Sequence, residues 1–591
     1  MGPLPLLGES FRRLCVRRVD GRTFLKKLGE ERGDDMNNAT IPEKMLAWPL
    51  FGAGMENFGV NDQPCEIPVP AIGPEELLVR IDAIGLCFSD VKLIRAGEAH
   101  PRVISKDLKK DPVIPGHEAV MTVVKVGEKL TGKFDIGERF IIQADIYVNG
   151  RGFAYGYAIN GGMEQYSVID QRVLNGDEGC YLLPISDDMP AAVAALLEPW
   201  TCVQASYMIE NRTAPLPGGR VFIAAGDGQV YGAGEALKQA APSSVVGFGL
   251  SPAAVEQLNA DLGVKMTLVD EIPSGVQFDD IFLCNLPTEF AEAAAKLGSR
   301  GAVTSFIGDY EGKTGMFDVG RIHYEGFFYQ GAPGTVLSAA YGRNVRSRMK
   351  KGGVCWLPGG AGAMGQMHTQ LAVENPDGPS RILVTDMDSD RIANVEKLLA
   401  ESIAERGIEF RAVNPSKLTP EEFDALLRDF APQGFDDIVM LVPVVPVLSH
   451  AANYLAEDGL MNIFAGIPAG MEGVLSIDGI VNCGHRYIGS SGSRTEHLRH
   501  TLVLAETGEL NPVTALAAIG GMKALKQGLE AVIGAKFPGK TVIFPNAPDM
   551  PLTPIREIAK LGPAIGGTLD CAGCYTMATE MELKRIYEQE R

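Results

Sequence analysis

Residues 353–372 read GVCWLPGGAGAMGQMHTQLA, and this stretch decides the fold of the larger part of the chain. An apolar run typical of a buried strand is followed by Gly360-x-Gly362-x-x-Gly365 and then by a helical composition. The first glycine permits a tight turn, the second lets backbone N–H groups approach a pyrophosphate, and the third lets the helix pack closely on the strand. The stretch predicts a dinucleotide-binding α/β domain rather than a glycine-rich turn without a ligand. The candidate cofactor contacts are Gly360, Gly362, Ala363, Met364 and Gly365.

The next predicted strand, in RILVTDMDSDR (residues 381–391), ends at Asp386, 21 residues after Gly365. A carboxylate at this position can accept both ribose hydroxyls and would repel a 2′-phosphate. The sequence therefore favours NAD(H) over NADP(H). Arg391, at the end of this stretch, is a further candidate contact.

The α/β part contains an internal repeat. Three blocks recur in the same order at offsets of 157 or 158 residues: Phe278–Ile281 with Phe435–Ile438, 301–308 with 459–466, and 326–334 with 484–492. Such constancy indicates a duplicated domain, so we expect two tandem Rossmann-type doubly wound domains, at 213–348 and 349–548. The third pair of blocks, GFFYQGAPG and GHRYIGSSG, suggests either an intrachain pseudo-dimer or a homo-oligomer.

The first copy is degenerate. It keeps Gly226 and Gly228, but Tyr231 stands at the third glycine position, and its next strand (SSVVGFGLSP) has no acidic residue at its end. We expect this copy to serve packing, assembly or substrate enclosure rather than NAD binding. A second nucleotide in another pose remains open.

Residues 36–212 have a different texture, with short alternating apolar runs separated by Gly, Pro and Asp turns, which predicts a mostly antiparallel β domain. The segments GLCFSD, PGHE and LLEPW lie in it. Thiolate, imidazole and carboxylate together form the usual ligand set of a catalytic zinc with an open position, although each residue alone has an ordinary structural explanation. The candidate zinc ligands are Cys87, His117, Glu118 and Glu198.

With these segments, the chain resembles the zinc-dependent medium-chain alcohol and polyol dehydrogenases over residues 45–548. The resemblance implies a GroES-like β catalytic domain in which Cys87 and His117 ligate one catalytic Zn2+. Glu118 or Glu198 would supply the remaining ligand, directly or through water. It further implies that Ser89 relays a proton and that Asp90 orients the zinc histidine. Hydride would pass between a secondary alcohol or ketone and NAD(H).

Three departures from the family pattern stand out. The lobe that often carries four cysteines, here QADIYVNGRGFAYGYAINGGMEQY, has none, so we expect no structural zinc. Lys92 replaces the histidine often found three residues after the relay residue, and it could extend the relay, bind an anionic substrate or point to solvent. The inserted first copy leaves open which copy packs over the zinc, and the intact fingerprint favours the second.

More loosely, the chain resembles the sugar-phosphate reductases typified by L-sorbose-1-phosphate reductase, which implies a sugar, polyol or sugar-phosphate substrate. Basic residues that could meet a phosphate, or could be ordinary solvated charges, are Arg95, His100, Arg102, Lys106 and Arg494. A threonine- or amino-alcohol-type zinc dehydrogenase shares every motif. A catalytically silent nucleotide-binding scaffold is the alternative from another class.

The composition limits which partners and cellular compartments suit the protein. The chain has 591 residues, with 54 Lys+Arg against 74 Asp+Glu, a formal charge of −20 that disfavours nucleic acid as a partner. Ten thinly spread cysteines indicate a reducing compartment, hence a cytoplasmic protein. The longest apolar run, 438–448, is too short to cross a membrane. Residues 1–35 read as a disordered leader or a targeting peptide, and 549–591 as a tail with a charged helix and a structural or incidental Cys571-x-x-Cys574 pair.

Overall fold

The computed structural model describes residues 41–227, 231–342, 345–570 and 573–588. It divides into two compact units, Met1–Glu198 with Leu498–Arg591, and Pro199–His497. The predicted leader, Gly228 and Cys571 lie outside the described residues.

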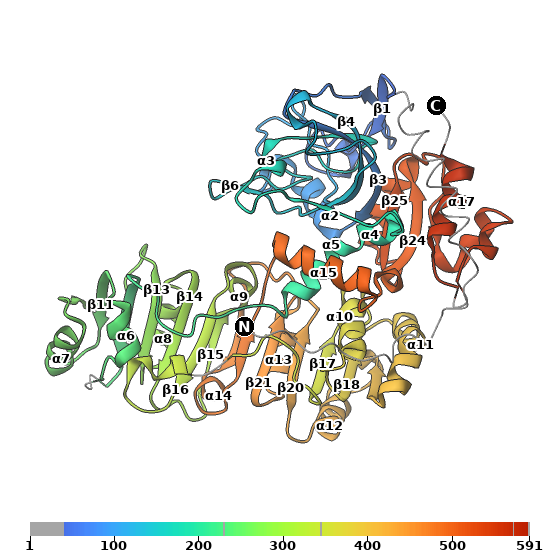
Figure 1. Ribbon diagram of the computed structural model, residues 1–591. Helices are drawn as coiled ribbons and strands as arrows, with labels where there is room; N and C mark the ends of the chain where they lie inside the picture. The colour runs from blue at the N-terminus through green and yellow to red at the C-terminus, as the bar shows by residue number, and fades with distance from the viewer. Residues whose placement is uncertain (1–40, 228–230, 343–344, 571–572, 589–591) are drawn as a thin grey trace. The chain divides into compact units, whose positions relative to one another are not determined.

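The first unit is built on an eight-stranded, mostly antiparallel sheet (Figure 1). Its central strand β3 (Leu77–Leu86) is buried over nearly its whole length because it is covered on both faces. β3 pairs antiparallel with β4, with β8 and with β25. The other strands of the sheet are β4 (Glu118–Val126), β5 (Arg139–Ile142), β8 (Tyr166–Ile169), β9 (Leu182–Pro184), β24 (Leu516–Gly521), β25 (Lys540–Phe544) and β26 (Thr553–Pro554).

The C-terminal strands show that the expected end of the second repeat at residue 548 is wrong. β24 and β25, drawn in red in Figure 1 beside the blue β3, belong to the sheet of the first unit. Met522, Leu529 and Ile543 are buried in the same core as Trp48 and Ile81. The chain returns to the first unit at Leu498, within α15 (Thr495–Thr507), and β25 then pairs with β3 in the sheet of that unit. The other expected domain edge, 212, differs from the division after Glu198 in α5 (Leu197–Ala205).

The second unit contains two six-stranded parallel sheets of the same topology, with orders β12-β11-β10-β13-β14-β16 and β19-β18-β17-β20-β21-β23. In each, the strand that follows the linker lies in the middle, as in a doubly wound fold. The first sheet comprises β10 (Arg220–Ala225), β11 (Ser244–Phe248), β12 (Thr267–Val269), β13 (Phe278–Cys284), β14 (Gly298–Ile307) and β16 (Phe328–Ala332). The second comprises β17 (Val354–Pro358), β18 (Arg381–Thr385), β19 (Glu409–Val413), β20 (Phe435–Met440), β21 (Leu455–Ile463) and β23 (Arg486–Ile488).

The repeated Phe-Asp-Asp-Ile block ties each copy to the linker in front of it. In the first copy, Arg212 donates to Asp280 Oδ1 at 2.9 Å, and the same carboxylate accepts from the backbone N–H of Leu216. In the second copy, Arg346 and the backbone N–H of Lys350 bind Asp437 in the same way. A buried carboxylate needs such partners, which explains why this block persists in both copies.

The two copies are joined by an antiparallel ribbon of β15 (Thr314–Asp318) and β22 (Glu472–Ser476). Met316 lies directly opposite Val474, its equivalent at the repeat offset of 158 residues, so the ribbon is centred on a pseudo-twofold axis. The two blocks expected to pair form β16 and β23, which lie in contact. In the described residues, however, the ladder that joins the copies is that of β15 and β22.

Within the described residues, no helix combines the length and apolar character that crossing a membrane requires.

Candidate functional site

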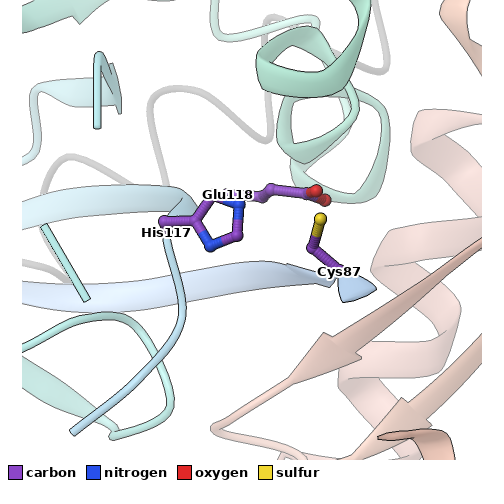
Figure 2. Close-up of side chains that lie close together, drawn as sticks. All are labelled: Cys87, His117 and Glu118. Atoms are coloured by element: carbon purple, nitrogen blue, oxygen red, sulfur yellow. The ribbon is translucent and has the colours of Figure 1, made fainter. Parts of the chain in front are cut away.

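Three predicted metal-ligating side chains converge in the first unit, as Figure 2 shows. Cys87 follows β3 directly and begins α2 (Phe88–Ala96), whereas Glu118 is the first residue of β4. Antiparallel pairing of Gly85 with Glu118 brings these strand ends together. One ligand atom from each of Cys87, His117 and Glu118 lies within 4.8 Å of the others.

Asp90 orients His117. Its Oδ1 lies 3.0 Å from His117 Nδ1, and its Oδ2 accepts from the backbone N–H of Cys87 at 3.0 Å. Burial alone would lower the pKa of His117, but the charges of Asp90 and Tyr157, with hydrogen bonds to Asp90 and Cys87, raise it well above its usual value. Because Nδ1 is engaged, Nε2 is the nitrogen left for a metal, and a carboxylate partner of this kind increases ligand basicity.

Glu118 is held on one side and open on the other. Lys540, at the start of β25, donates to Glu118 Oε1 at 2.5 Å. Within the described residues, the buried Oε2 has no hydrogen-bond partner. Gly85 leaves room for it, because a Cβ at that position would lie 2.1 Å from Oε2. Lys540 is not predictable as a site residue, since a lysine at the start of an apolar strand carries no local signal of a buried ion pair.

Glu198 lies outside the tight group but within its electrostatic reach. It is the second residue of α5 and is half-buried. Burial raises its pKa to about 7; the charge of Glu118 adds to this rise, while those of His117 and Lys540 oppose it. The structure therefore places Glu118, rather than Glu198, with the thiol and the imidazole.

The remaining predicted residues of the first unit lie on α2 and on the following loop. Ser89 is half-buried and Lys92 is exposed. The His100 ring contacts the Tyr157 ring in a tilted arrangement with centroids 5.1 Å apart, and the Tyr157 centroid lies 5.9 Å from that of His117. A second group comprises Arg102, which pairs with Asp145 and lies over the Tyr157 ring; Arg95, which lies over Phe88; and the exposed Lys106.

The glycine fingerprint in the second unit has the form expected for a cofactor turn. Gly359 has φ +82°, and Gly362 is the N-cap of α10 (Ala363–Glu374). A Cβ on Gly365 would lie 2.0 Å from the Gly359 carbonyl oxygen, so only glycine lets the helix approach this closely. Gly360 is similarly enclosed by Leu357 and Thr369. The first turn of α10, including Met364, thus directs backbone N–H groups toward a position suited to an anion.

Asp386 lies at the carboxyl end of β18, half-buried, and accepts from the backbone N–H of Asp388. Asp388 caps α11 (Ser389–Arg406), and Arg391 is paired with it at 3.6 Å. Met387 beside Asp386 is 70% exposed. This edge of the sheet presents the carboxylate that the sequence singled out for a ribose.

Among the described residues of the first copy, polar and aromatic side chains lie beside the position that corresponds to the cofactor turn. Tyr231 is fully buried and donates to Asp227, while Asn285 donates to both of these side chains. The helix that follows, α6 (Glu235–Ala240), begins four residues after Tyr231 and has only six residues. A carboxylate and a tyrosine thus occupy the end of β10.

Comparisons with known proteins agree with this arrangement. The alcohol dehydrogenase GroES-like domain matches residues 73–175. The chain is 25% identical over 499 residues to mannitol-1-phosphate 5-dehydrogenase of Aliivibrio fischeri, covering 83% of this chain and 86% of that protein. It is 22% identical over 510 residues to L-sorbose 1-phosphate reductase of Klebsiella pneumoniae, covering 85% and 90%.

Among solved structures, 2R,3R-butanediol dehydrogenase from Bacillus subtilis matches with a TM-score of 0.50 and 16% identity, covering 85% of this chain and 100% of that one. This likeness and the matched domain confirm the predicted combination of a GroES-like domain with Rossmann-type sheets.

Proposed function

Because the chain carries an alcohol dehydrogenase GroES-like domain and resembles the medium-chain dehydrogenases over most of its length, we propose that it is a zinc- and NAD-dependent oxidoreductase. It would transfer hydride between NAD(H) and a secondary alcohol or ketone of a sugar, polyol or sugar phosphate. The observation that carries this proposal is the convergence of Cys87, His117 and Glu118.

The residues present fit a zinc ion. The buried Glu118 Oε2 lacks a partner within the described residues, and His117 keeps Nε2 available while Asp90 holds Nδ1. A thiolate, an imidazole and a carboxylate are the ligands that zinc prefers, with the fourth position left for substrate. Bound zinc would polarise the carbonyl, or lower the pKa of the alcohol hydroxyl.

Side chains of this chain would orient the metal ligands and transfer the substrate proton. Asp90 fixes the His117 tautomer, and Lys540 keeps the Glu118 carboxylate in place. Ser89, two residues after Cys87, would accept the substrate proton while releasing its own hydroxyl proton toward solvent, and Lys92 is exposed on the same helix. No covalent intermediate is required.

The residues of the second copy fit NAD(H). The enclosed Gly365 and the first turn of α10 would hold the pyrophosphate, and Asp386 would accept from the ribose hydroxyls. The same carboxylate would repel a 2′-phosphate, so NAD(H) is preferred over NADP(H).

Two observations favour a phosphate ester as substrate. Two relatives matched over more than four fifths of this chain are named for sugar phosphates. In addition, the Tyr157 ring contacts the rings of both His117 and His100, and burial together with the charges of Arg102 and Lys92 lowers the pKa of His100, which places these two cations near that ring. Cationic side chains at this distance from the metal ligands suit a substrate phosphate.

The test is NADH consumption with a panel of ketoses, ketose phosphates and the ketone of threonine, on zinc-loaded protein. Wild type is compared with Cys87→Ser and with Cys65→Ser, a half-buried cysteine of the same unit. We expect turnover of ketose phosphates, lost together with bound zinc in Cys87→Ser and retained in Cys65→Ser. Turnover of amino ketones alone would show that the substrate is an amino alcohol or amino ketone and not a sugar phosphate. Absence of bound zinc in wild type would favour a catalytically silent scaffold.

A further inference from the structure

A short buried helix lies behind the proposed metal site. α4 (Ala191–Ala195) is buried at all five residues and packs on β3, β4 and β25. These are the strands from which Cys87, Glu118 and Lys540 are presented. Only Leu196 separates α4 from α5, whose second residue is Glu198. A displacement of α4 would therefore act on the strands that present Cys87 and Glu118 and on the helix that carries Glu198.

The N-terminus of α4 is closed by a side chain from the far end of the sequence. Glu580 accepts from the backbone N–H of Ala191 at 2.9 Å through Oε1 and from that of Ala192 at 3.0 Å through Oε2. Its residue is 1% exposed. The first N–H groups of a helix have no partner inside the helix, and a carboxylate is the most favourable acceptor at that end.

Glu580 is itself held in place. It lies on α17 (Met577–Tyr587), from which Lys584 donates to Oε1 at 3.0 Å, and Tyr575, just before the helix, donates to Oε2 at 3.4 Å. Thr576 caps α17 and also donates to the backbone carbonyl of Thr568. A buried carboxylate with four donors, one of them the Lys584 cation, is held rigidly, because loss of any partner leaves a buried acceptor unsatisfied.

We propose that Glu580 is a positioning residue for the metal site, acting through α4. It fixes the helix that packs on β3, β4 and β25 and that leads into Glu198. The C-terminal helix is thus part of the catalytic unit rather than an appendage. This inference rests on the proposed function, since it assumes that a metal is bound by Cys87, His117 and Glu118.

The test uses the full-length protein loaded with Co2+, whose visible absorption reports thiolate ligation and coordination geometry. Glu580→Ala and Glu580→Gln are compared with wild type and with Glu582→Gln, a control on the same helix whose carboxylate pairs with the exposed Arg585. We expect Glu580→Ala to change the Co2+ spectrum and to lower kcat about 10-fold or more. KM for NADH should stay unchanged, because the cofactor residues belong to the second unit. Glu580→Gln, which retains one acceptor oxygen, should lie between wild type and Glu580→Ala.

An unchanged Co2+ spectrum and kcat in Glu580→Ala, with only a lower Tm, would overturn the proposal and leave Glu580 a structural residue. If wild type binds no Co2+, the proposed function fails instead. Should Glu580→Ala not fold, Tyr575→Phe removes one donor to Glu580 while keeping the carboxylate. A small spectral change in that variant would support the proposal, and an unaltered spectrum with unaltered kcat would count against it.

Discussion

The ammonium group of Lys540 lies 2.5 Å from Oε1 of Glu118, and both residues are buried, with 5% and 1% exposure. The Glu118 charge raises the pKa of Lys540 against the opposing effect of burial. The pair joins two strands separated by 422 residues in sequence. Charge at the proposed site is therefore balanced by a segment that the sequence alone assigns to another domain.

We predict that Lys540→Met destabilises the first unit strongly. Removing one partner of a buried pair leaves the other charge uncompensated, at a cost of about 3–5 kcal/mol. Chemical unfolding followed by tryptophan fluorescence would measure this loss. Lys523→Met, which breaks an exposed pair with Asp549, should cost less than about 1 kcal/mol. Equal losses of unfolding free energy in the two variants would show that burial does not make the Lys540 pair more important for stability than an exposed pair.

The fold was predictable from the sequence where spacing carries the information. The repeated blocks predicted two doubly wound sheets, and the GLCFSD and PGHE segments lie at the ends of paired strands. Lys540 and Glu580 could not be predicted, because their partners lie hundreds of residues away and neither stands in a recognisable motif. The end of the second repeat was misplaced for a related reason: β24 and β25 are apolar runs that suit either sheet, and only tertiary pairing with β3 assigns them.

We predict that Asp386→Ser weakens NADH binding and relaxes the preference against NADPH. The carboxylate at the end of β18 is the group proposed to accept from the ribose, so KM for NADH should rise about 10-fold or more while kcat changes little. Steady-state kinetics with both cofactors would measure this. Asp377→Asn, an exposed aspartate of the same copy, serves as the control. An unchanged cofactor preference in Asp386→Ser would remove Asp386 from the cofactor site.

We predict that one NADH binds per chain although two Rossmann-type sheets are present. In the first copy, the Asp227 carboxylate and the buried Tyr231 occupy the end of β10, where a pyrophosphate would meet like charge. Titration calorimetry should give a stoichiometry near one, and Gly365→Val should abolish binding, since a side chain there meets the Gly359 carbonyl. A stoichiometry of two, or residual binding in Gly365→Val, would assign a nucleotide site to the first copy.

A last prediction concerns Glu164, a buried residue distant in sequence from the proposed ligands. Burial raises its pKa to about 8, partly offset by a hydrogen bond to Ser167. The folded chain therefore keeps a proton that the unfolded chain releases at lower pH. The contribution of Glu164 to the free energy of unfolding is fully present below its ordinary pKa and is lost as pH rises toward about 8.

Glu164→Gln should remove this fall, because an amide resembles the protonated acid at every pH. Relative to wild type, the free energy of unfolding of the variant should rise by on the order of 2–3 kcal/mol between pH 5 and pH 8. Denaturant unfolding at both pH values measures the gain, with Glu128→Gln, an exposed glutamate, as the control. A gain that does not grow with pH would mean that Glu164 is ionised in the folded protein, and a compensating cation would then have to lie beside it.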